Sequence, residues 1–283
     1  MTHVPTLWAG FSLDRPLVMG ILNVTPDSFS DGGKHAASDT AIEAGRAMLA
    51  AGVDIIDVGG ESTRPNAALV APADEIARVR PVIEALAREG AVISADTRHA
   101  ATMEAALAAG ARIINDVSGL KHDPRAAALV AQAGCPVVLM HMRGTPQTMD
   151  SQTHYINLVE DVLAELTATR DAAIDAGIRA ENIALDPGFG FAKRAAQNLR
   201  LLQATGRFVA LGHPVLIGVS RKRFIGEASG EADAAKRLPG SLAAGLYALS
   251  QGAALLRVHD VAETIQALRV WERLVAIEDD PDP

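Results

Sequence analysis

The amino-acid sequence predicts an α/β protein folded as a single-domain (β/α)8 TIM barrel, and three observations lead to this fold. Eight short segments along the chain are continuously apolar and rich in β-branched residues. Such strands are typical of a parallel sheet that is covered on both faces. Alanine-rich segments with helical spacing separate them. Eight strand–helix units in about 250 residues match the size of a barrel.

The predicted strands follow one another along almost the whole chain. A doubly wound sheet is the alternative fold, but no G-x-G-x-x-G motif follows the first strand. The barrel is therefore preferred. In order, the predicted strands cover residues 18–24, 54–60, 91–97, 112–118, 136–142, 182–188, 214–220 and 255–260.

Helical segments lie between these strands and carry start signals. Asp123 followed by Pro124 predicts an N-cap and a first helical residue. Asp260 and Glu263 have the spacing of a capping box. The clearest helical patterns cover residues 40–52, 101–110 and 155–177.

Composition and charge limit the partners of the chain. We find no linker, so one domain over 1–283 is expected, with a core over about 17–275 and an acidic tail at 276–283. The formal net charge of −8 argues against nucleic acid and anionic membranes as partners. An anionic small molecule stays compatible, because charges are screened within about 10 Å. The single cysteine, Cys135, and the lack of a leader-like or long apolar segment predict a cytoplasmic protein.

Polar residues stand at or just after the carboxyl ends of all eight predicted strands. In a barrel these ends meet at one mouth, where active sites of this fold are built. Any one of them could instead be a helix cap or turn residue, but eight together favour a site. They are Asn23, Asp57, Asp96, Asn115, His141, Asp186, Ser220 with Lys222, and Arg257 with His259.

The polar residues divide into two chemical groups. Asp96, Asp186 and Asn115 suit the N–H edge of a heterocycle, because a carboxylate accepts two parallel hydrogen bonds. The basic residues suit an anion, so the predicted ligand has a polar ring and a phosphate. The basic set is Arg64, Arg221, Lys222, Arg257 and His259. Arg221 and the neighbouring Arg223 can pair with acids, so both are left out of the predicted site.

Two glycine-containing loops follow the first and second strands. The segments "SFSDGGKH" at 28–35 and "GGESTRPNAALVAP" at 59–72 are long for this type of connection. Their composition is that of mobile lids, although ordinary surface loops are the alternative.

Several short motifs lie at and after the predicted strands. They are "GILNVTPDSFSDGG", "DVGGESTRP", "LMHM", "DPGFGFAK", "SRK" and "RVHDV", with the shorter "DT" at 96–97 and "IND" at 114–116. Together these motifs resemble the dihydropteroate synthase family of folate biosynthesis. The resemblance runs from about Leu17 to Trp271. It implies that 6-hydroxymethyl-7,8-dihydropterin diphosphate condenses with 4-aminobenzoate to give 7,8-dihydropteroate and diphosphate. It also implies Mg²⁺ as cofactor, a homodimer and competition by sulfonamides.

The resemblance implies a role for each matching residue. Lys222, Arg257, Asp96 and Asp186 are expected to be catalytic. The pterin is expected on Asp96, Asn115, Met140, Asp186, Lys222 and Arg257. The diphosphate is expected on Asn23, Thr63, Arg64, Arg257 and His259, with Asn23 also the Mg²⁺ ligand. The aminobenzoate is expected near Phe29, Thr63, Pro65, Phe191 and Ser220.

The expected chemistry is a substitution at the CH₂ next to the pterin ring. Neutralised diphosphate is a good leaving group and the pterin stabilises a cation, so a dissociative, SN1-like path is favoured. The neutral arylamine needs no strong general base, and the sequence contains no convincing nucleophile and base pair.

Three substitutions depart from the family pattern. Asn66 replaces a glycine, and Arg194 and Gln197 replace a threonine and a histidine. They affect the loops around the aminobenzoate and leave the pterin and diphosphate sets complete. For His141 a hydrogen-bonded barrel residue is favoured over a catalyst. Asp57 is equally compatible with loop bracing and ligand contact.

Two other functions remain as alternatives. A corrinoid-dependent pterin methyltransferase would share the acidic pterin residues but has no use for Arg64, Lys222 and His259. A non-catalytic pterin-binding paralogue is the second alternative, since the altered loops could remove turnover.

Overall fold

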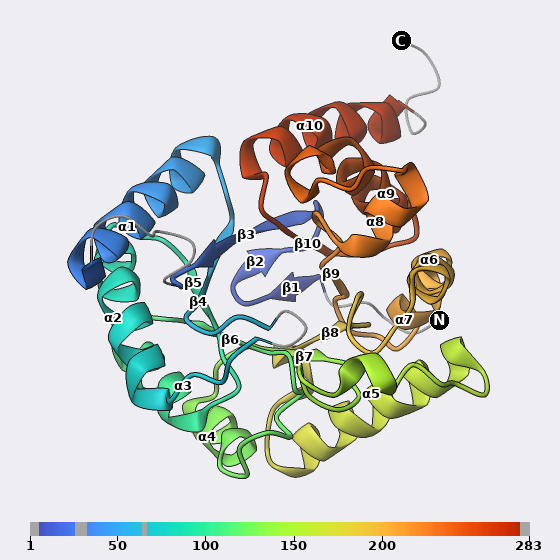
Figure 1. The fold of residues 1–283 in the computed structure, drawn as a ribbon. Coiled ribbons are helices and arrows are strands. Elements are labelled where there is room, and N and C mark those ends of the chain that lie inside the picture. The colour runs from blue at the N-terminus through green and yellow to red at the C-terminus, as the bar shows by residue number, and fades with distance from the viewer. Residues whose placement is uncertain (1–5, 26–32, 64–66, 278–283) are drawn as a thin grey trace.

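The predicted barrel is present in the structure. A computed structural model of the chain describes residues 6–25, 33–63 and 67–277. In that part of the chain, eight parallel strands form one sheet in the order β8-β7-β6-β5-β4-β3-β10-β9. A parallel bridge between Leu185 and Val215 joins its two ends, so the sheet nearly closes (Figure 1). The strands are β3 (Leu17–Asn23), β4 (Ile55–Gly59), β5 (Ile93–Asp96), β6 (Ile113–Asp116), β7 (Val137–Met140), β8 (Ile183–Asp186), β9 (Leu216–Ile217) and β10 (Leu255–Val258).

The strand register brings the polar strand ends to one rim. Asn23 of β3 lies opposite Gly59 of β4, and Gly59 lies opposite Asp96 of β5. Asp96 in turn lies opposite Asn115 of β6. Consecutive strands therefore present their carboxyl ends side by side, as the sequence predicts.

Helices surround the strands on the outside of the barrel (Figure 1). Neighbouring strand residues face opposite sides, so Ile55 packs inside the barrel while Ile56 packs against the helices. Both faces are buried, which explains the continuously apolar strands. The helices are α1 (Gly33–Ala51), α2 (Pro72–Arg88), α3 (Ala100–Ala108), α4 (Ala126–Ala133), α5 (Leu158–Asp175), α6 (Ala195–Gln203), α7 (Thr205–Val209), α8 (Arg223–Ser229), α9 (Leu238–Ser250) and α10 (Val261–Ile277), with 3₁₀ turns η2 (Met149–Ser151), η3 (Ala180–Asn182) and η4 (Ala234–Lys236).

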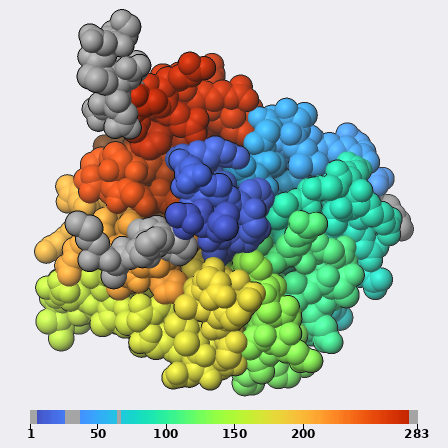
Figure 2. Space-filling view, turned by 180° about the vertical axis from the view of Figure 1, so that it is seen from behind, coloured from blue at the N-terminus to red at the C-terminus, as the bar shows by residue number. Residues whose placement is uncertain are grey.

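A short N-terminal hairpin closes the end of the barrel opposite the mouth. β1 (Leu7–Trp8) pairs antiparallel with β2 (Phe11–Ser12). Trp8 is 2% exposed and packs with Leu17 and Leu255 at the amino ends of the strands. Its indole N–H donates to the carbonyl of Asn182 over 3.1 Å. Figure 2 shows this segment in blue at the centre of that face.

One predicted helix start and one predicted capping box are wrong. Helix α4 begins at Ala126, two residues after Pro124. The Asp123 carboxylate instead accepts the backbone N–H groups of Arg125 and of Ala100, the first residue of α3. Asp260 does precede α10, but its carboxylate pairs with Arg221 instead of forming the predicted capping box. In both cases a tertiary partner takes the carboxylate.

None of the helices in the described ranges is both long enough and apolar enough to cross a membrane. This agrees with the lack of long apolar segments in the sequence.

Candidate active site

Arg257 lies at the barrel mouth between two carboxylates. β10 carries it, and its guanidinium donates to Asp57 of β4 and to Asp96 of β5, both over 2.6 Å. Asn115 of β6 donates its amide to the same Asp57 oxygen over 3.0 Å. Within the described residues, Asp57 accepts from no loop backbone group; it is fully buried and its carboxylate holds Arg257 and Asn115 in place.

The acidic side of this cluster has spare hydrogen-bond acceptors. Burial raises the pKa of Asp96 to about 7, against the attraction of Arg257 and helped by nearby Asp57. Burial also raises the pKa of Asp186. Among the described residues, Oδ1 of Asp57 has no hydrogen-bond partner. Asp57 is closed off, so the carboxylates that a ligand could reach are Asp96 and Asp186, which are 9% and 6% exposed and suit a ligand that offers N–H groups.

Lys222 stands beside this cluster at the N-cap of α8. Its Nζ lies 4.4 Å from the centre of the Phe191 ring, a cation–π contact. Burial and the charge of Arg257 lower the pKa of Lys222 to about 8, while Asp186 acts to raise it. Two predicted site residues, Lys222 and Phe191, therefore touch each other directly.

His259 and Ser220 form a pair next to Arg257. The Ser220 hydroxyl oxygen accepts the backbone N–H of His259 and lies 3.1 Å from its ring Nδ1. Burial, Arg257 and Arg221 lower the pKa of His259 to about 4, so the ring is neutral at pH 7. Arg221 is bound to Asp260, which agrees with leaving it out of the site.

The remaining predicted residues are placed as follows. Asn23 ends β3 at the rim and is half-buried. Met140, at the end of β7, packs in one apolar cluster with Phe191. Thr63 is half-buried in the loop after β4. Phe29, Arg64, Pro65 and the substituted Asn66 lie outside the described residues.

A buried ion pair holds the base of the loop after β4. The Arg98 guanidinium donates to both Glu61 oxygens over 2.9 Å, and both side chains are almost fully buried. The same carboxylate accepts the backbone N–H of Val70 over 3.2 Å, so it ties the two ends of the loop together. The sequence did not reveal this pair, because Glu61 and Arg98 are far apart in the chain.

The loop after β8 rests on the loop after β7. Gln197 accepts the backbone N–H of Arg194, and both side chains reach Thr153. The two substituted residues therefore support a loop contact. Tyr155 donates its hydroxyl to the carbonyl of Ala192.

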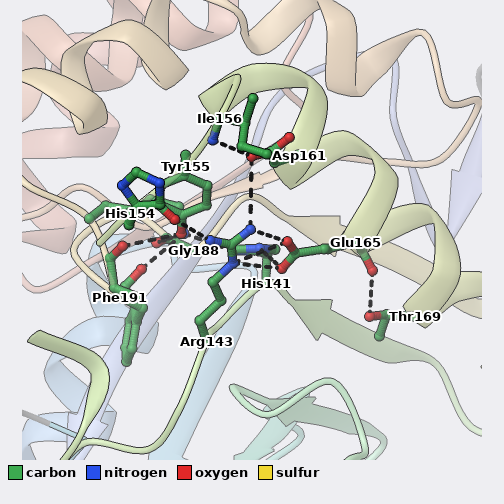
Figure 3. A network of polar contacts seen from close by, with 12 residues as sticks. His141, Arg143, His154, Tyr155, Ile156, Asp161, Glu165, Thr169, Gly188 and Phe191 are labelled. Carbon is green, nitrogen blue, oxygen red and sulfur yellow. Dashed lines mark hydrogen bonds and ion pairs between the residues drawn. The ribbon is translucent and has the colours of Figure 1, made fainter. Parts of the chain in front are cut away.

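Lys193 and His141 are central to this contact, and the sequence reasoning gave Lys193 no role. Lys193 is 4% exposed and lies 2.9 Å from Nδ1 of His141. His141 is hydrogen-bonded, as predicted, with Glu165 as its second partner (Figure 3). The sequence feature that could have revealed Lys193 is its place as the last residue of the "DPGFGFAK" motif.

The Asp116 carboxylate accepts backbone N–H groups of Ser118 and Leu120 and thus braces its loop.

Comparison with known proteins identifies the family. Residues 19–259 match the pterin binding enzyme family. The dihydropteroate synthase of Neisseria meningitidis serogroup B is 47% identical over 93% of this chain and 94% of its own. The chain belongs to the dihydropteroate synthase family. The sequence resemblance is therefore confirmed.

Solved structures of dihydropteroate synthases have the same fold. The Xanthomonas albilineans dihydropteroate synthase with 4-aminobenzoic acid superposes with a TM-score of 0.89 at 48% identity and covers 94% of this chain and 95% of that one. The enzyme from the same organism in complex with 7,8-dihydropteroate has a TM-score of 0.86 at 46% identity, with 94% and 96% covered. In this chain, the family motifs "SRK" and "RVHDV" are those that supply Lys222, Arg257 and His259 to the barrel mouth.

Proposed function

We propose that this chain condenses 6-hydroxymethyl-7,8-dihydropterin diphosphate with 4-aminobenzoate to give 7,8-dihydropteroate and diphosphate. The observation that carries the proposal is the barrel mouth, where Asp96 and Asp186 stand beside Lys222, Arg257 and His259. A ligand with a hydrogen-bonding ring and an anionic group fits both halves. The Xanthomonas albilineans relatives hold 4-aminobenzoic acid and 7,8-dihydropteroate, which are a reactant and the product of this reaction.

The pterin ring is assigned to the acidic half of the mouth. Asp96, Asn115 and Asp186 would accept the ring N–H groups, and Met140 would pack on its face. A bound N–H edge would favour the ionised form of Asp96, whose pKa burial raises to about 7. Lys222 would donate to the carbonyl and ring-nitrogen side of the pterin. Arg257 would cover the ring while it faces the diphosphate.

The diphosphate is assigned to Asn23, Thr63, Arg64, Arg257 and His259. The neutral His259 ring is oriented by Ser220, and either tautomer leaves Nε2 free of that contact. An approaching anion would raise its pKa and favour the charged form.

Mg²⁺ is proposed as the cofactor. In the parts of the chain that the structure describes, no group of three or more His, Cys, Asp or Glu side chains could hold a metal. The half-buried Asn23 at the rim fits an ion that keeps waters and takes phosphate oxygens for its other ligands. Bound there, Mg²⁺ would neutralise charge on the leaving diphosphate.

The substitution itself is proposed to be dissociative. Cationic side chains stabilise the departing diphosphate, and the electron-rich ring stabilises the cation left on the CH₂ group. The aminobenzoate would lie near Phe29, Thr63, Pro65, Phe191 and Ser220. Closure of the loops that follow the first and second barrel strands would exclude water from the mouth, because water could otherwise react with the cation.

A homodimer in the cytoplasm is also proposed. The outer helices α9 and α10 expose the apolar residues Tyr247, Val270 and Leu274, at 42%, 59% and 62%. Covering them in a second copy would remove apolar surface from water. Sedimentation equilibrium of the purified chain tests the dimer.

The activity is tested with purified protein, the pterin diphosphate, Mg²⁺ and labelled 4-aminobenzoate. Labelled dihydropteroate is the expected product, and Lys222→Ala should reduce its rate about 100- to 1,000-fold while the protein stays folded. Binding of the pterin without turnover would instead support the non-catalytic paralogue. The methyltransferase alternative is not favoured, because the relatives are dihydropteroate synthases.

A further inference from the structure

The fully enclosed amine of Lys193 has three acceptors around it. Nζ lies 2.9 Å from Nδ1 of His141, 2.9 Å from the carbonyl of Gly188 and 3.0 Å from the carbonyl of Phe191. In its charged form this amine has three N–H donors and no acceptor, so each hydrogen then has one partner. Neither the expected pterin set nor the expected diphosphate set includes this residue.

The protonation of His141 is determined by its two neighbours. Glu165 cannot donate, so Nε2–H of His141 donates to its carboxylate over 3.0 Å. Nδ1 is then the acceptor that Lys193 needs. Burial and the charge of Lys193 lower the pKa of His141 to about 4, which keeps the ring neutral. Arg143 is bound to the same Glu165 and lies 4.0 Å from the centre of the Tyr155 ring (Figure 3).

The loop that Lys193 holds has a demanding backbone. Gly188, Gly190 and Ala192 have φ values of +73°, +80° and +51°. Such conformations persist only where surrounding contacts determine them, above all for a residue with a side chain such as Ala192. A Cβ on Gly188 would lie 1.9 Å from the carbonyl oxygen of His141, so the loop is packed tightly against the first residue after β7. Without Lys193, the carbonyl of Phe191 would lose this donor, and the carbonyl of Gly188 would keep only the backbone N–H of Phe191, which it accepts over 3.2 Å.

Phe191 is the side chain that this loop delivers to the mouth. It is buried in one cluster with Met140, and Lys222 lies over its ring. A shift of the loop backbone would move the surface on which Lys222 rests.

We propose that Lys193 is a positioning residue: through Gly188 and Phe191 it holds the Phe191 ring where Lys222 and the aminobenzoate need it. The assignment of the aminobenzoate to Phe191 rests on the proposed function. The series of hydrogen bonds from Glu165 through His141 to Lys193 orients the Lys193 amine. Burial lowers the pKa of Lys193 to about 7, with Asp186 and Glu165 acting against this and Lys222 and Arg143 adding to it.

The test compares Lys193→Met with Lys236→Met, an exposed lysine whose side chain is 71% accessible. In Lys193→Met we expect the KM for 4-aminobenzoate to rise at least tenfold and kcat to fall by up to about 100-fold. The KM for the pterin diphosphate should change by less than about threefold. Lys236→Met should match the wild type in all three. Equal changes in both KM values, or no change, would overturn the proposal.

A second readout does not need turnover. With fluorophenylalanine incorporated, the ¹⁹F resonance of Phe191, assigned through Phe191→Leu, should move in Lys193→Met, while that of the distant Phe11 stays in place. An unmoved Phe191 resonance would also overturn the proposal. If the wild type forms no product, the proposed function fails, and this signal still decides the positioning role.

Glu165→Gln provides a milder variant in case Lys193→Met does not fold. The Glu165 side chain is 37% accessible, so its replacement should be tolerated. It keeps Lys193 but weakens the orientation of His141. A smaller rise of the aminobenzoate KM alone, with a smaller Phe191 shift, supports the proposal, and wild-type values in both measurements contradict it.

Discussion

Lys222 has a lowered pKa because burial and the nearby Arg257 both disfavour its charged form, and this gives the reaction a pH limit. The proposed role needs the ammonium form, which the free enzyme loses as the pH rises through about 8. We therefore expect kcat/KM for the pterin diphosphate to fall above about pH 8, since this parameter reports groups of the free enzyme. Residual activity in Lys222→Arg should lack this limb, because arginine stays charged. An unchanged limb in the variant would assign it to another group.

Asn23 is the residue whose functional role separates most clearly from a structural one. It ends β3 and is half-buried, so Asn23→Ala should change the free energy of unfolding by about 1 kcal/mol or less. Loss of its oxygen should raise the Mg²⁺ concentration needed for half-maximal rate roughly tenfold or more. Mg²⁺ titration of the rate and urea unfolding measure the two effects. A large loss of stability with no change in the Mg²⁺ requirement would make Asn23 structural.

At the scale of elements, the strands were predictable and the contacts between their loops were not. Continuous apolar runs specify strands such as β6 and β7, because both of their faces are buried. The polar strand ends then predict which residues lie at the rim of the barrel, so the sequence was sufficient to place Asp96 and Asn115 next to each other there. The predicted helix start at Asp123 was wrong because the Asp123 carboxylate caps α3, and the local sequence around Asp123 does not show that contact. Lys193 and Arg98 were missed for the same reason.

The loop after β4 depends on the buried pair of Glu61 and Arg98. Arg98→Met would leave an unpaired carboxylate that is 8% exposed, which costs about 3–5 kcal/mol. Urea unfolding should show this loss. Arg88→Met, at a side chain that is 78% accessible, should stay within about 0.5 kcal/mol of the wild type. The double variant Glu61→Met with Arg98→Met should recover part of the loss, since no charge is left buried. A double variant as unstable as Arg98→Met would rule out this explanation.

At the scale of the whole molecule, the barrel separates stability from chemistry. The mouth holds the polar cluster, and the opposite end is closed by the hairpin of β1 and β2. Trp8 fills that end and donates its indole N–H to the carbonyl of Asn182, although the sequence places Trp8 before the expected start of the core at residue 17.

Trp8→Ala should therefore lower the free energy of unfolding by about 3–5 kcal/mol. Trp271→Ala, at a half-buried position on α10, should cost less. Both KM values should stay within about twofold in Trp8→Ala, because packing at the floor does not touch the substrates. Urea unfolding and steady-state kinetics below the transition measure this, and a large rise in either KM would mean that the floor and the mouth are coupled.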